Sequence, residues 1–240
     1  MKAVILAGGR GTRLSPITCV LPKPLVPLDE TAILEVVLRQ LKHHGFADIT
    51  LTLGYLAELI QGYLAQHRRL TEGLNLSYAV EEQPTGTAGS LAAVAGLRQQ
   101  GEPFLVMNGD ILTTLDFGRL MHDHRASGAD LTIASYRKRV PIDLGVLELN
   151  ADGQVQGYIE KPEHFYPVSM GIYVYEPRVL DFIAPGEYLD FPSLVLRLLG
   201  AGRRVQAWRS DALWLDIGRP TDYSEAQELF RQRRQEFLPD

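Results

Sequence analysis

The hydrophobic pattern of the first half alternates between short apolar runs and segments with helical spacing. Residues 3–6 form an apolar run that ends in glycines, which is typical of a buried strand. Apolar residues then recur at helical spacing between Ile33 and Leu41, and Gly45 follows, where glycine commonly ends a helix. Residues 49–53 alternate apolar side chains with threonines, as strands do. The same reasoning predicts strands at 76–80 and 104–107 and helices at 56–64 and 88–97.

This order of strands and helices predicts an α/β fold. Strands that alternate with helices along the chain usually form a mostly parallel, Rossmann-like sheet with helices on both faces. Ligands of such sheets bind beyond the carboxyl ends of the strands. The polar residues that follow each predicted strand are therefore the candidates for a functional site.

The second half has a different pattern, with several strand-like segments in succession. Residues 151–153 have the composition of a hairpin turn between two of them. The sequence shows no linker and no internal repeat, so we expect one domain whose second half adds a smaller, β-rich substrate lobe. The predicted strands are 131–136, 145–149, 155–160, 168–175, 205–208 and 214–215, and a final helix is predicted at about 222–236.

Composition and charge exclude several functional classes. The chain has 240 residues, of which 45% are hydrophobic and 22% charged, as in soluble globular proteins. Its 24 Lys and Arg against 29 Asp and Glu give a net charge of −5, which disfavours a nucleic-acid partner. Cys19 is the single cysteine and allows neither an internal disulfide nor a thiolate zinc site. We expect no membrane partner and a cytoplasmic location, because no apolar run approaches the ~18 residues of a membrane span.

The most informative motif directly follows the first predicted strand. Residues 6–14 have the sequence LAGGRGTRL, and such glycine-rich turns let backbone N–H groups approach phosphates closely. Leu14 breaks the dinucleotide-binding fingerprint, and the turn lacks the Gly-Lys-Ser/Thr of a Walker loop. A tight turn without a ligand would explain the glycines alone. However, Arg13 follows them, and Lys23 is held between Pro22 and Pro24, which favours the binding of a polyanion.

Together these motifs resemble the signature of the sugar-1-phosphate nucleotidyltransferases. The resemblance begins with residues 6–14 and the PKPL sequence at 22–25. It implies that a nucleoside triphosphate condenses with a sugar 1-phosphate to give a nucleotide sugar and pyrophosphate, with Mg²⁺ as cofactor. In its motifs, above all at residues 81–89, the sequence most resembles mannose-1-phosphate guanylyltransferase-like members. We expect a member without the C-terminal β-helix, because no hexapeptide repeat occurs near the C-terminus. The resemblance extends through residues 81–89, 108–110, 145, 160–162 and 214–223.

The resemblance also implies a role for each matching residue. Arg13 would hold the β- and γ-phosphates, Lys23 the α-phosphate and Lys161 the phosphate of the sugar. Asp110 and Asp216 would hold Mg²⁺ together, although either aspartate alone would be interpreted as a helix cap or turn residue. Implied nucleotide-binding residues are Leu6, Ala7, Gly8, Gly9, Gly11, Thr12, Glu81, Pro84, Gly86 and Thr87. Implied sugar-binding residues are Asn108, Gly145, Glu160, Met170 and Gly171; Glu160 and Lys161 could alternatively form a surface ion pair.

Glu81 bears on which base is bound. Thymidylyl- and uridylyltransferases of this family often carry Gln at this position. An ionised carboxylate offers two acceptors and no donor, which suits the N1–H and N2–H₂ edge of guanine. Thr85 departs from the guanylyltransferase pattern, where Leu is usual, and Gln83 or the backbone could read the base instead. We therefore expect GTP and mannose 1-phosphate, with a thymidylyl- or uridylyltransferase of glucose 1-phosphate, or a guanylyltransferase of a heptose 1-phosphate, as alternatives.

A different functional class is a regulatory subunit that binds nucleotide sugars without making them. Such a subunit would be expected to lose charged catalytic residues, but Arg13, Lys23, Asp110, Lys161 and Asp216 are all present. An enzyme is therefore favoured, and homo-oligomerisation stays open. Within the single domain, 1–240, we expect 1–112 to be mainly the nucleotide-binding half, 113–222 mainly the sugar-phosphate half and 223–240 a C-terminal helix.

Overall fold

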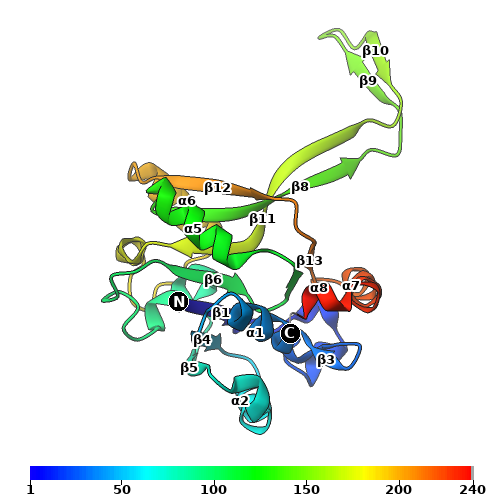
Figure 1. The fold of residues 1–240 in the computed structure, drawn as a ribbon. Coiled ribbons are helices and arrows are strands. Elements are labelled where there is room, and N and C mark those ends of the chain that lie inside the picture. Colours follow the sequence, from blue (N-terminus) through cyan, green and yellow to red (C-terminus); the bar gives the residue numbers. More distant parts are fainter. Residues whose placement is uncertain (239–240) are drawn as a thin grey trace.

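A seven-stranded sheet forms the centre of the computed structural model, which describes residues 1–238 (Figure 1). Its strands in chain order are β1 (Lys2–Ala7), β4 (Asp48–Leu53), β5 (Asn75–Val80), β6 (Phe104–Asn108), β8 (Leu131–Pro141), β11 (Glu163–Tyr175) and β12 (Val205–Ser210). Their order across the sheet is β12-β8-β11-β6-β1-β4-β5. Strands β5, β4, β1 and β6 are parallel to one another, as are β8 and β12. Only β11 runs antiparallel to its neighbours, so the predicted α/β fold with a mostly parallel sheet is confirmed.

Helices cover both faces of the sheet and bury a separate core on each. In β1, Ala3 and Ile5 point into one core and Val4 into the other. This burial on both faces explains the uninterrupted apolar runs of the central strands. The core of one face contains residues of α1 (Ile33–His43), α2 (Ala57–Gln66) and α5 (Phe117–Ser127) and extends to α7 (Pro220–Gln232) and α8 (Arg234–Phe237). The other core is covered by α4 (Gly86–Gly89), η4 (Ser90–Ala93), η5 (Pro177–Phe182) and α6 (Phe191–Gly200).

Two predicted helices differ from the observed ones. The helix predicted at 88–97 is replaced by the short turns α4 and η4, because Gly89 and Gly96 weaken a helix there and Gly96 adopts a φ of +72°. The C-terminal helix predicted at 222–236 begins earlier and is divided into α7 and α8 at Arg233. Residues 239–240 of the expected C-terminal helix lie outside the described residues. Among residues 1–238, no helix is both long and apolar enough to cross a membrane.

Short elements connect this framework around the edge where β1 ends. They are η1 (Thr12–Leu14), η2 (Ile17–Cys19), η3 (Lys23–Leu25), β2 (Pro27–Leu28), β3 (Thr31–Ala32), β7 (Ile111–Thr113) and β13 (Trp214–Asp216). The short helix α3 (Arg68–Thr71) precedes β5 at the opposite edge, where β1 begins. Strands β7 and β13 form a small antiparallel pair, so a segment just before α7 lies beside the residues that follow β6.

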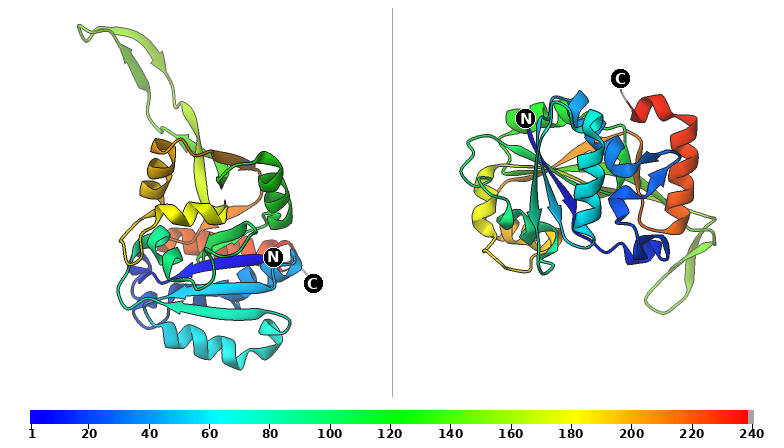
Figure 2. Two further views of the ribbon diagram at one scale, coloured as in Figure 1. Left: turned by 90° about the vertical axis from the view of Figure 1, so that its left-hand side faces the viewer. Right: turned by 90° about the horizontal axis from the view of Figure 1, so that it is seen from below.

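A long two-stranded arm projects from the body of the molecule (Figures 1 and 2). Strands β8 and β11 are longer than predicted and extend beyond the point where β12 ends opposite Tyr136. Their extensions lead into the hairpin of β9 (Val146–Leu149) and β10 (Val155–Ile159), which turns at 151–153 as predicted. Residues 137–167 are called the arm below. The β-rich second half thus has two parts. Strands β8, β11 and β12 widen the central sheet, and the arm projects from it.

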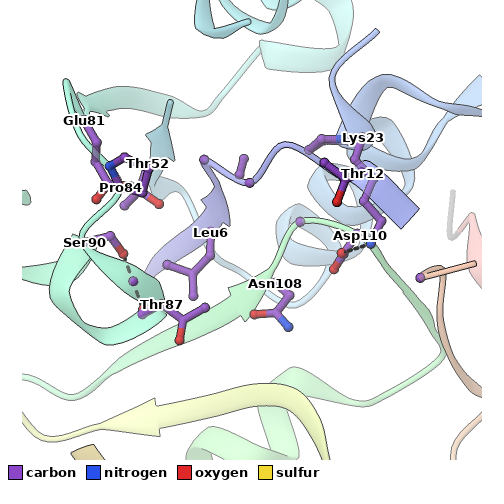
Figure 3. A pocket seen from close by; sticks show the side chains of 18 of the residues that line it. Leu6, Thr12, Lys23, Thr52, Glu81, Pro84, Thr87, Ser90, Asn108 and Asp110 are labelled. Carbon is purple, nitrogen blue, oxygen red and sulfur yellow. Dashed lines mark hydrogen bonds and ion pairs between the residues drawn. The ribbon is translucent and has the colours of Figure 1, made fainter. Parts of the chain in front are cut away.

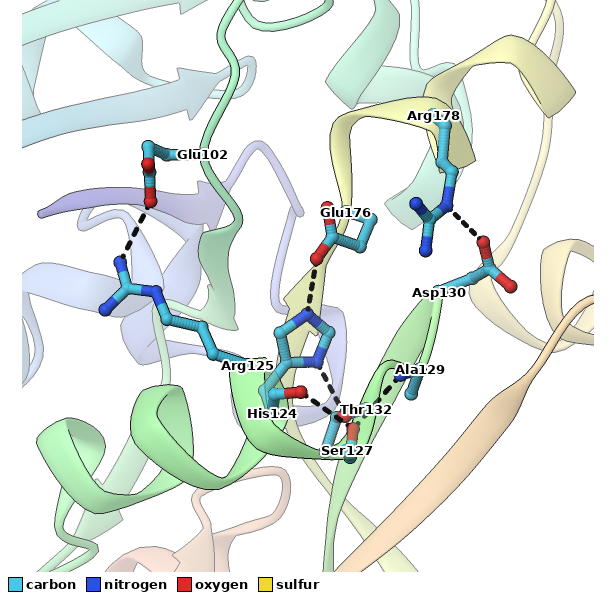
Figure 4. Close-up of polar contacts among 9 residues, drawn as sticks. All are labelled: Glu102, His124, Arg125, Ser127, Ala129, Asp130, Thr132, Glu176 and Arg178. Atoms are coloured by element: carbon cyan, nitrogen blue, oxygen red, sulfur yellow. Dashed lines mark hydrogen bonds and ion pairs between the residues drawn. The ribbon is translucent and has the colours of Figure 1, made fainter.

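Asp130 joins three segments at the start of β8 (Figure 4). Its carboxylate accepts hydrogen bonds from the Arg178 side chain and from the Arg204 N–H at 2.9 Å. Burial opposes the ionisation of Asp130, which is only 7% exposed, but the two arginines outweigh this effect and lower the pKa of the carboxyl. Nearby, His124 lies between the Thr132 hydroxyl and Glu176.

We expect Asp130→Asn to lower the free energy of unfolding at pH 7 by about 1–2 kcal/mol, the scale of hydrogen bonds to charged groups. Because the folded-state pKa is lowered, this stabilisation is present above the ordinary value of 3.8 and is lost as the pH falls through the folded-state pKa. Urea unfolding at several pH values measures the effect. Asp181→Asn is the control, because that side chain is 72% exposed. An equal loss at pH 7 and at pH 3 would contradict the argument.

Candidate active site

A cavity of about 440 Å³ lies at the carboxyl ends of the parallel strands (Figure 3). Because β1, β4, β5 and β6 are parallel, the residues that follow them meet at one edge of the sheet. The cavity is lined by fourteen of the predicted site residues: Leu6, Ala7, Gly8, Gly9, Gly11, Thr12, Arg13, Lys23, Glu81, Pro84, Gly86, Thr87, Asn108 and Asp110.

The glycine-rich turn forms one wall and has a conformation that needs glycine at position 11. Gly11 adopts a φ of +61°, and a Cβ there would lie 3.0 Å from Cγ2 of Thr18. The Thr18 hydroxyl donates a hydrogen bond of 2.7 Å to the Gly11 carbonyl, which fixes the turn from behind. The backbone therefore stays open toward the cavity, as an anion-binding turn requires.

Lys23 and Asp110 form an ion pair at one end of the cavity. Lys23 is on η3 and is only 8% exposed, and Asp110 follows β6. A nearly buried ammonium group needs a partner, because removing its charge from water without one is costly. The ion pair satisfies that need and keeps Lys23 at the cavity.

Asp216 lies beside Asp110 because β13 pairs with β7. Asp216 is opposite Ile111, and the Ile217 N–H donates a 3.2 Å hydrogen bond to the Asp110 carbonyl. Partial desolvation and the Asp110 carboxylate raise the pKa of Asp216, against the opposite effects of Lys23 and Arg13. Two carboxylates predicted from distant parts of the sequence are therefore neighbours.

This carboxylate pair suits a cation that also binds a substrate. The Asp110 Oδ1 atom is buried and has no hydrogen-bond partner within the described residues. No group of three or more His, Cys, Asp or Glu side chains among residues 1–238 could form a metal site by itself. Mg²⁺ commonly uses one or two carboxylates and takes its other ligands from water and substrate phosphates. The donor set thus fits Mg²⁺ held together with a phosphate-containing substrate.

Glu81 and Pro84 lie at the opposite end of the cavity from Lys23 and Asp110 (Figure 3). One carboxylate oxygen of Glu81 accepts hydrogen bonds from the backbone N–H and the hydroxyl of Thr85. The other oxygen lies toward Gly8, where a Cβ would come within 3.0 Å of it. Thr85, which differs from the usual Leu, thus holds Glu81 in place and leaves one acceptor oxygen at the cavity.

The predicted sugar-binding residues occupy two separate places. Asn108 lines the cavity. Gly171 lies against the Asn108 side chain: it adopts a φ of +70°, and a Cβ at this position would lie only 2.6 Å from the Asn108 Nδ2 atom. Met170 is fully buried, and its carbonyl accepts a 2.8 Å hydrogen bond from Trp214. Met170 and Gly171 therefore do not line the cavity, although Gly171 lies against Asn108, which does.

Gly145, Glu160 and Lys161 are in the arm, and the structure does not bring them to the cavity. Glu160 and Lys161 are exposed, and Glu160 accepts a 3.0 Å hydrogen bond from the Tyr158 hydroxyl within the arm. Gly145 packs against the ring of the same tyrosine. The sugar-phosphate residues implied by the resemblance are therefore separated from the nucleotide residues.

Five further residues line the cavity and were not singled out from the sequence as site residues. Thr52 is at the end of β4, where the rule about carboxyl ends of parallel strands could have identified it. Gly109 lies between two predicted residues. The others are Pro24, Ser90 and Gly218, and only Gly218 comes from beyond residue 110.

The chain is similar to curated proteins and solved structures over nearly its whole length. It is 31% identical over 233 residues, 96% of this chain and 64% of the relative, to the mannose-1-phosphate guanylyltransferase catalytic subunit beta of Dictyostelium discoideum. It is 34% identical over 245 residues, 94% of this chain and 62% of the relative, to the UTP–glucose-1-phosphate uridylyltransferase of Synechocystis. The chain thus spans slightly less than two thirds of the length of these two relatives.

Among solved structures, HddC from Yersinia pseudotuberculosis complexed with GMP-PN superimposes with a TM-score of 0.74 at 26% identity, covering 95% of this chain and 99% of that one. The family model described as nucleotidyl transferase matches residues 2–233. That match includes the glycine-rich turn, the strand ends and Asp110, which line the cavity, and also Asp216, which lies beside Asp110 but does not line the cavity. The chain therefore belongs to the nucleotidyl transferase family of sugar-1-phosphate nucleotidyltransferases.

Proposed function

We propose that this protein condenses a nucleoside triphosphate with a sugar 1-phosphate and releases a nucleotide sugar and pyrophosphate. The observation that carries the proposal is the arrangement of charge along the cavity, with Glu81 at one end and the Lys23–Asp110 ion pair at the other, where Asp216 lies beside Asp110. A base at the Glu81 end would place its phosphates along the glycine-rich turn. Apart from Gly218, the lining comes from residues 6–110, which supports 1–112 as the nucleotide-binding half.

The proposed reaction needs alignment and charge neutralisation rather than a general base. An oxygen of the sugar phosphate, already anionic at neutral pH, attacks the α-phosphorus, and the bond to the β-phosphate oxygen breaks as pyrophosphate leaves. Lys23 is placed to hold the α-phosphate and Arg13 the β- and γ-phosphates. Holding two anions in line and stabilising the charge that shifts to pyrophosphate can supply most of the rate enhancement.

Asp110 and Asp216 are the residues that would hold Mg²⁺. When bound, the ion would neutralise phosphate charge that the two carboxylates would otherwise repel. Asp110 also keeps Lys23 at the cavity, so the same carboxylate organises both cations. In this proposal Lys161 holds the sugar phosphate, Glu160 the sugar hydroxyls and the Gly145 backbone the sugar ring.

GTP and mannose 1-phosphate are the proposed substrates. Several relatives are named as mannose-1-phosphate guanylyltransferases, and HddC is described in complex with GMP-PN. The free oxygen of Glu81 at the cavity supports guanine, because it can accept from guanine N–H groups. The uridylyltransferase relative supports UTP and glucose 1-phosphate as the second candidate pair. The ordinary composition and single cysteine support a cytoplasmic enzyme.

Pyrophosphate release with Mg²⁺ and mannose 1-phosphate tests the substrates directly. We expect GTP to give the fastest release among GTP, dTTP, UTP, ATP and CTP, because only guanine presents two N–H donors at the edge that Glu81 would face. Glucose and heptose 1-phosphates are run in parallel as alternative acceptors. Faster release with UTP or dTTP would refute the assignment of the base, and no release with any pair would refute the reaction.

Glu81→Gln tests the base-reading role separately. We expect the variant to lose about 10- to 100-fold in kcat/KM for GTP, the equivalent of a charge-assisted hydrogen bond, and to lose less for UTP. Glu82→Gln is the matched control, because this neighbouring carboxylate is exposed and does not line the cavity. Equal losses for both nucleotides would argue that Glu81 has a structural role only.

The raised pKa of Asp216 gives a test that does not depend on turnover. Without metal, ionised Asp216 destabilises the folded state, since folding raises its pKa and favours the protonated form. Asp216→Asn should therefore raise the free energy of unfolding at pH 7 in EDTA by up to about 1 kcal/mol, as expected for partly solvated charges. This gain should vanish below the ordinary pKa of 3.8.

The same variant should lose the stabilisation that Mg²⁺ and GTP together give the wild type. Turnover should fall at least ~100-fold, as should that of Asp110→Asn, because both remove electrostatic stabilisation from the phosphate end. Unfolding in EDTA and in Mg²⁺ with GTP provides the comparison. A variant that is still stabilised by Mg²⁺ and GTP to the wild-type extent would exclude Asp216 as a ligand.

A further inference from the structure

The arm is solvated along its whole length. None of residues 137–167 is buried, although the body of the molecule has a dense core on both faces of the sheet. The hydrogen bonds and ion pairs formed by residues 142–162 stay within the arm, such as those joining Ile142 to Pro162 and Tyr158 to Glu160. Figures 1 and 2 show it extending away from the other elements.

The composition of the arm does not suit a solvated structure. Nine of the eighteen exposed large apolar side chains among the described residues are in these 31 residues. An isolated two-stranded hairpin is marginally stable at best in water, and large exposed apolar patches mark interaction sites. The nine are Val140, Leu144, Leu147, Leu149, Val155, Tyr158, Ile159, Phe165 and Tyr166. The arm therefore needs a surface to pack against.

The cavity lacks the part of the site that the arm carries. No residue between 111 and 217 lines it, and its two basic side chains, Arg13 and Lys23, are assigned to the phosphates of the nucleotide, so none is left for the phosphate of the sugar. In the proposed function, Lys161, Glu160 and Gly145 provide that part. The arm thus combines exposed apolar side chains with the residues that the cavity is missing.

We propose that the arm of each chain packs against a second copy of this chain. There, Gly145, Glu160 and Lys161 of the arm complete the partner's site, and this second step rests on the proposed function. A two-fold pair would exchange arms reciprocally, as in domain swapping. Stable interfaces usually take about 20–30 residues from each partner, and the arm offers a segment of that size.

The geometry of the sheet favours the second copy over the chain's own cavity. The ladder between β8 and β11 is continuous from the Pro141–Glu163 pair to the Ser135–Ser169 pair. The arm is therefore a regular two-stranded ladder, which joins the rest of the sheet across a register shift between Ser169 and Tyr173 and is directed away from the body (Figure 1). To reach its own cavity, the arm would have to turn back from the direction in which the structure holds it (Figures 1 and 2).

The mass of the full chain in solution is the first test. We expect a dimer, and we expect Leu147→Ser combined with Leu149→Ser to weaken it at least ~100-fold, because two exposed leucines on one face of β9 lose their buried contacts. Leu196→Ser with Leu199→Ser on α6 is the matched control, since these leucines are also more than half exposed but lie outside the arm. Circular dichroism verifies folding. A monomeric wild type, or equal weakening by both double variants, would overturn the proposal.

Mixed dimers test whether the arm serves the partner's site. Lys161→Ala removes the sugar-phosphate ligand of the arm, and Asp110→Asn removes a proposed Mg²⁺ ligand at the cavity of the body. A dimer made of either variant alone should therefore be inactive. With exchanged arms, a doubly tagged heterodimer has one site with both native residues, and about half of the wild-type activity should return. The control heterodimer joins Asp110→Asn to Lys23→Ala; both changes are in the body, so it should stay inactive.

The outcomes separate this proposal from the proposed function. A heterodimer of Lys161→Ala and Asp110→Asn that stays inactive would show that each arm serves its own chain and would overturn the exchange. Wild-type chain that is dimeric but inactive with every substrate pair would refute the proposed function. In that case the mass in solution of the Leu147→Ser, Leu149→Ser double variant still shows whether the arm forms the dimer interface.

Discussion

The parallel direction of β1, β4, β5 and β6 is the constraint on which the site depends. It brings four chain segments that follow these strands to one edge of the sheet, although they are far apart in the sequence. The glycine-rich turn, Glu81 and Asp110 then lie around a single cavity. The small β7–β13 pair brings Asp216 beside Asp110, and partial burial together with the Asp110 carboxylate raises the pKa of Asp216.

Much of this site could be predicted because its signals are local. The motif at 6–14, the prolines around Lys23 and the polar residues after strands require only the sequence and the rule for parallel sheets. The prediction that Asp110 and Asp216 lie next to each other rests on the family resemblance, since no spacing rule relates residues so far apart in the sequence. Thr52 was missed because its alternation with apolar residues indicates a strand and not a cavity. Gly218 was missed because its place depends on the β7–β13 pairing.

The arm shows where prediction from the sequence ends. The apolar segments 145–149 and 155–160 and the turn between them were identified as strands and a hairpin, and the structure contains both. Their position could not be predicted, because the hydrophobic pattern of a strand does not state which surface will cover it. Arg137, Lys138 and Arg139 are exposed, and β8 continues through them to the arm. Burial by a second chain would explain why this pattern is apolar without being buried.

The direction of bond formation is the central chemical claim, and isotope labelling tests it most directly. Mannose 1-phosphate labelled with ¹⁸O in the non-bridging phosphate oxygens is incubated with GTP, Mg²⁺ and the wild-type chain, and both products are analysed by mass spectrometry. Attack by the sugar phosphate on the α-phosphorus predicts that all of the label is in the nucleotide sugar and that the pyrophosphate is unlabelled. Label in the released phosphate product, or no labelled nucleotide sugar at all, would contradict the account.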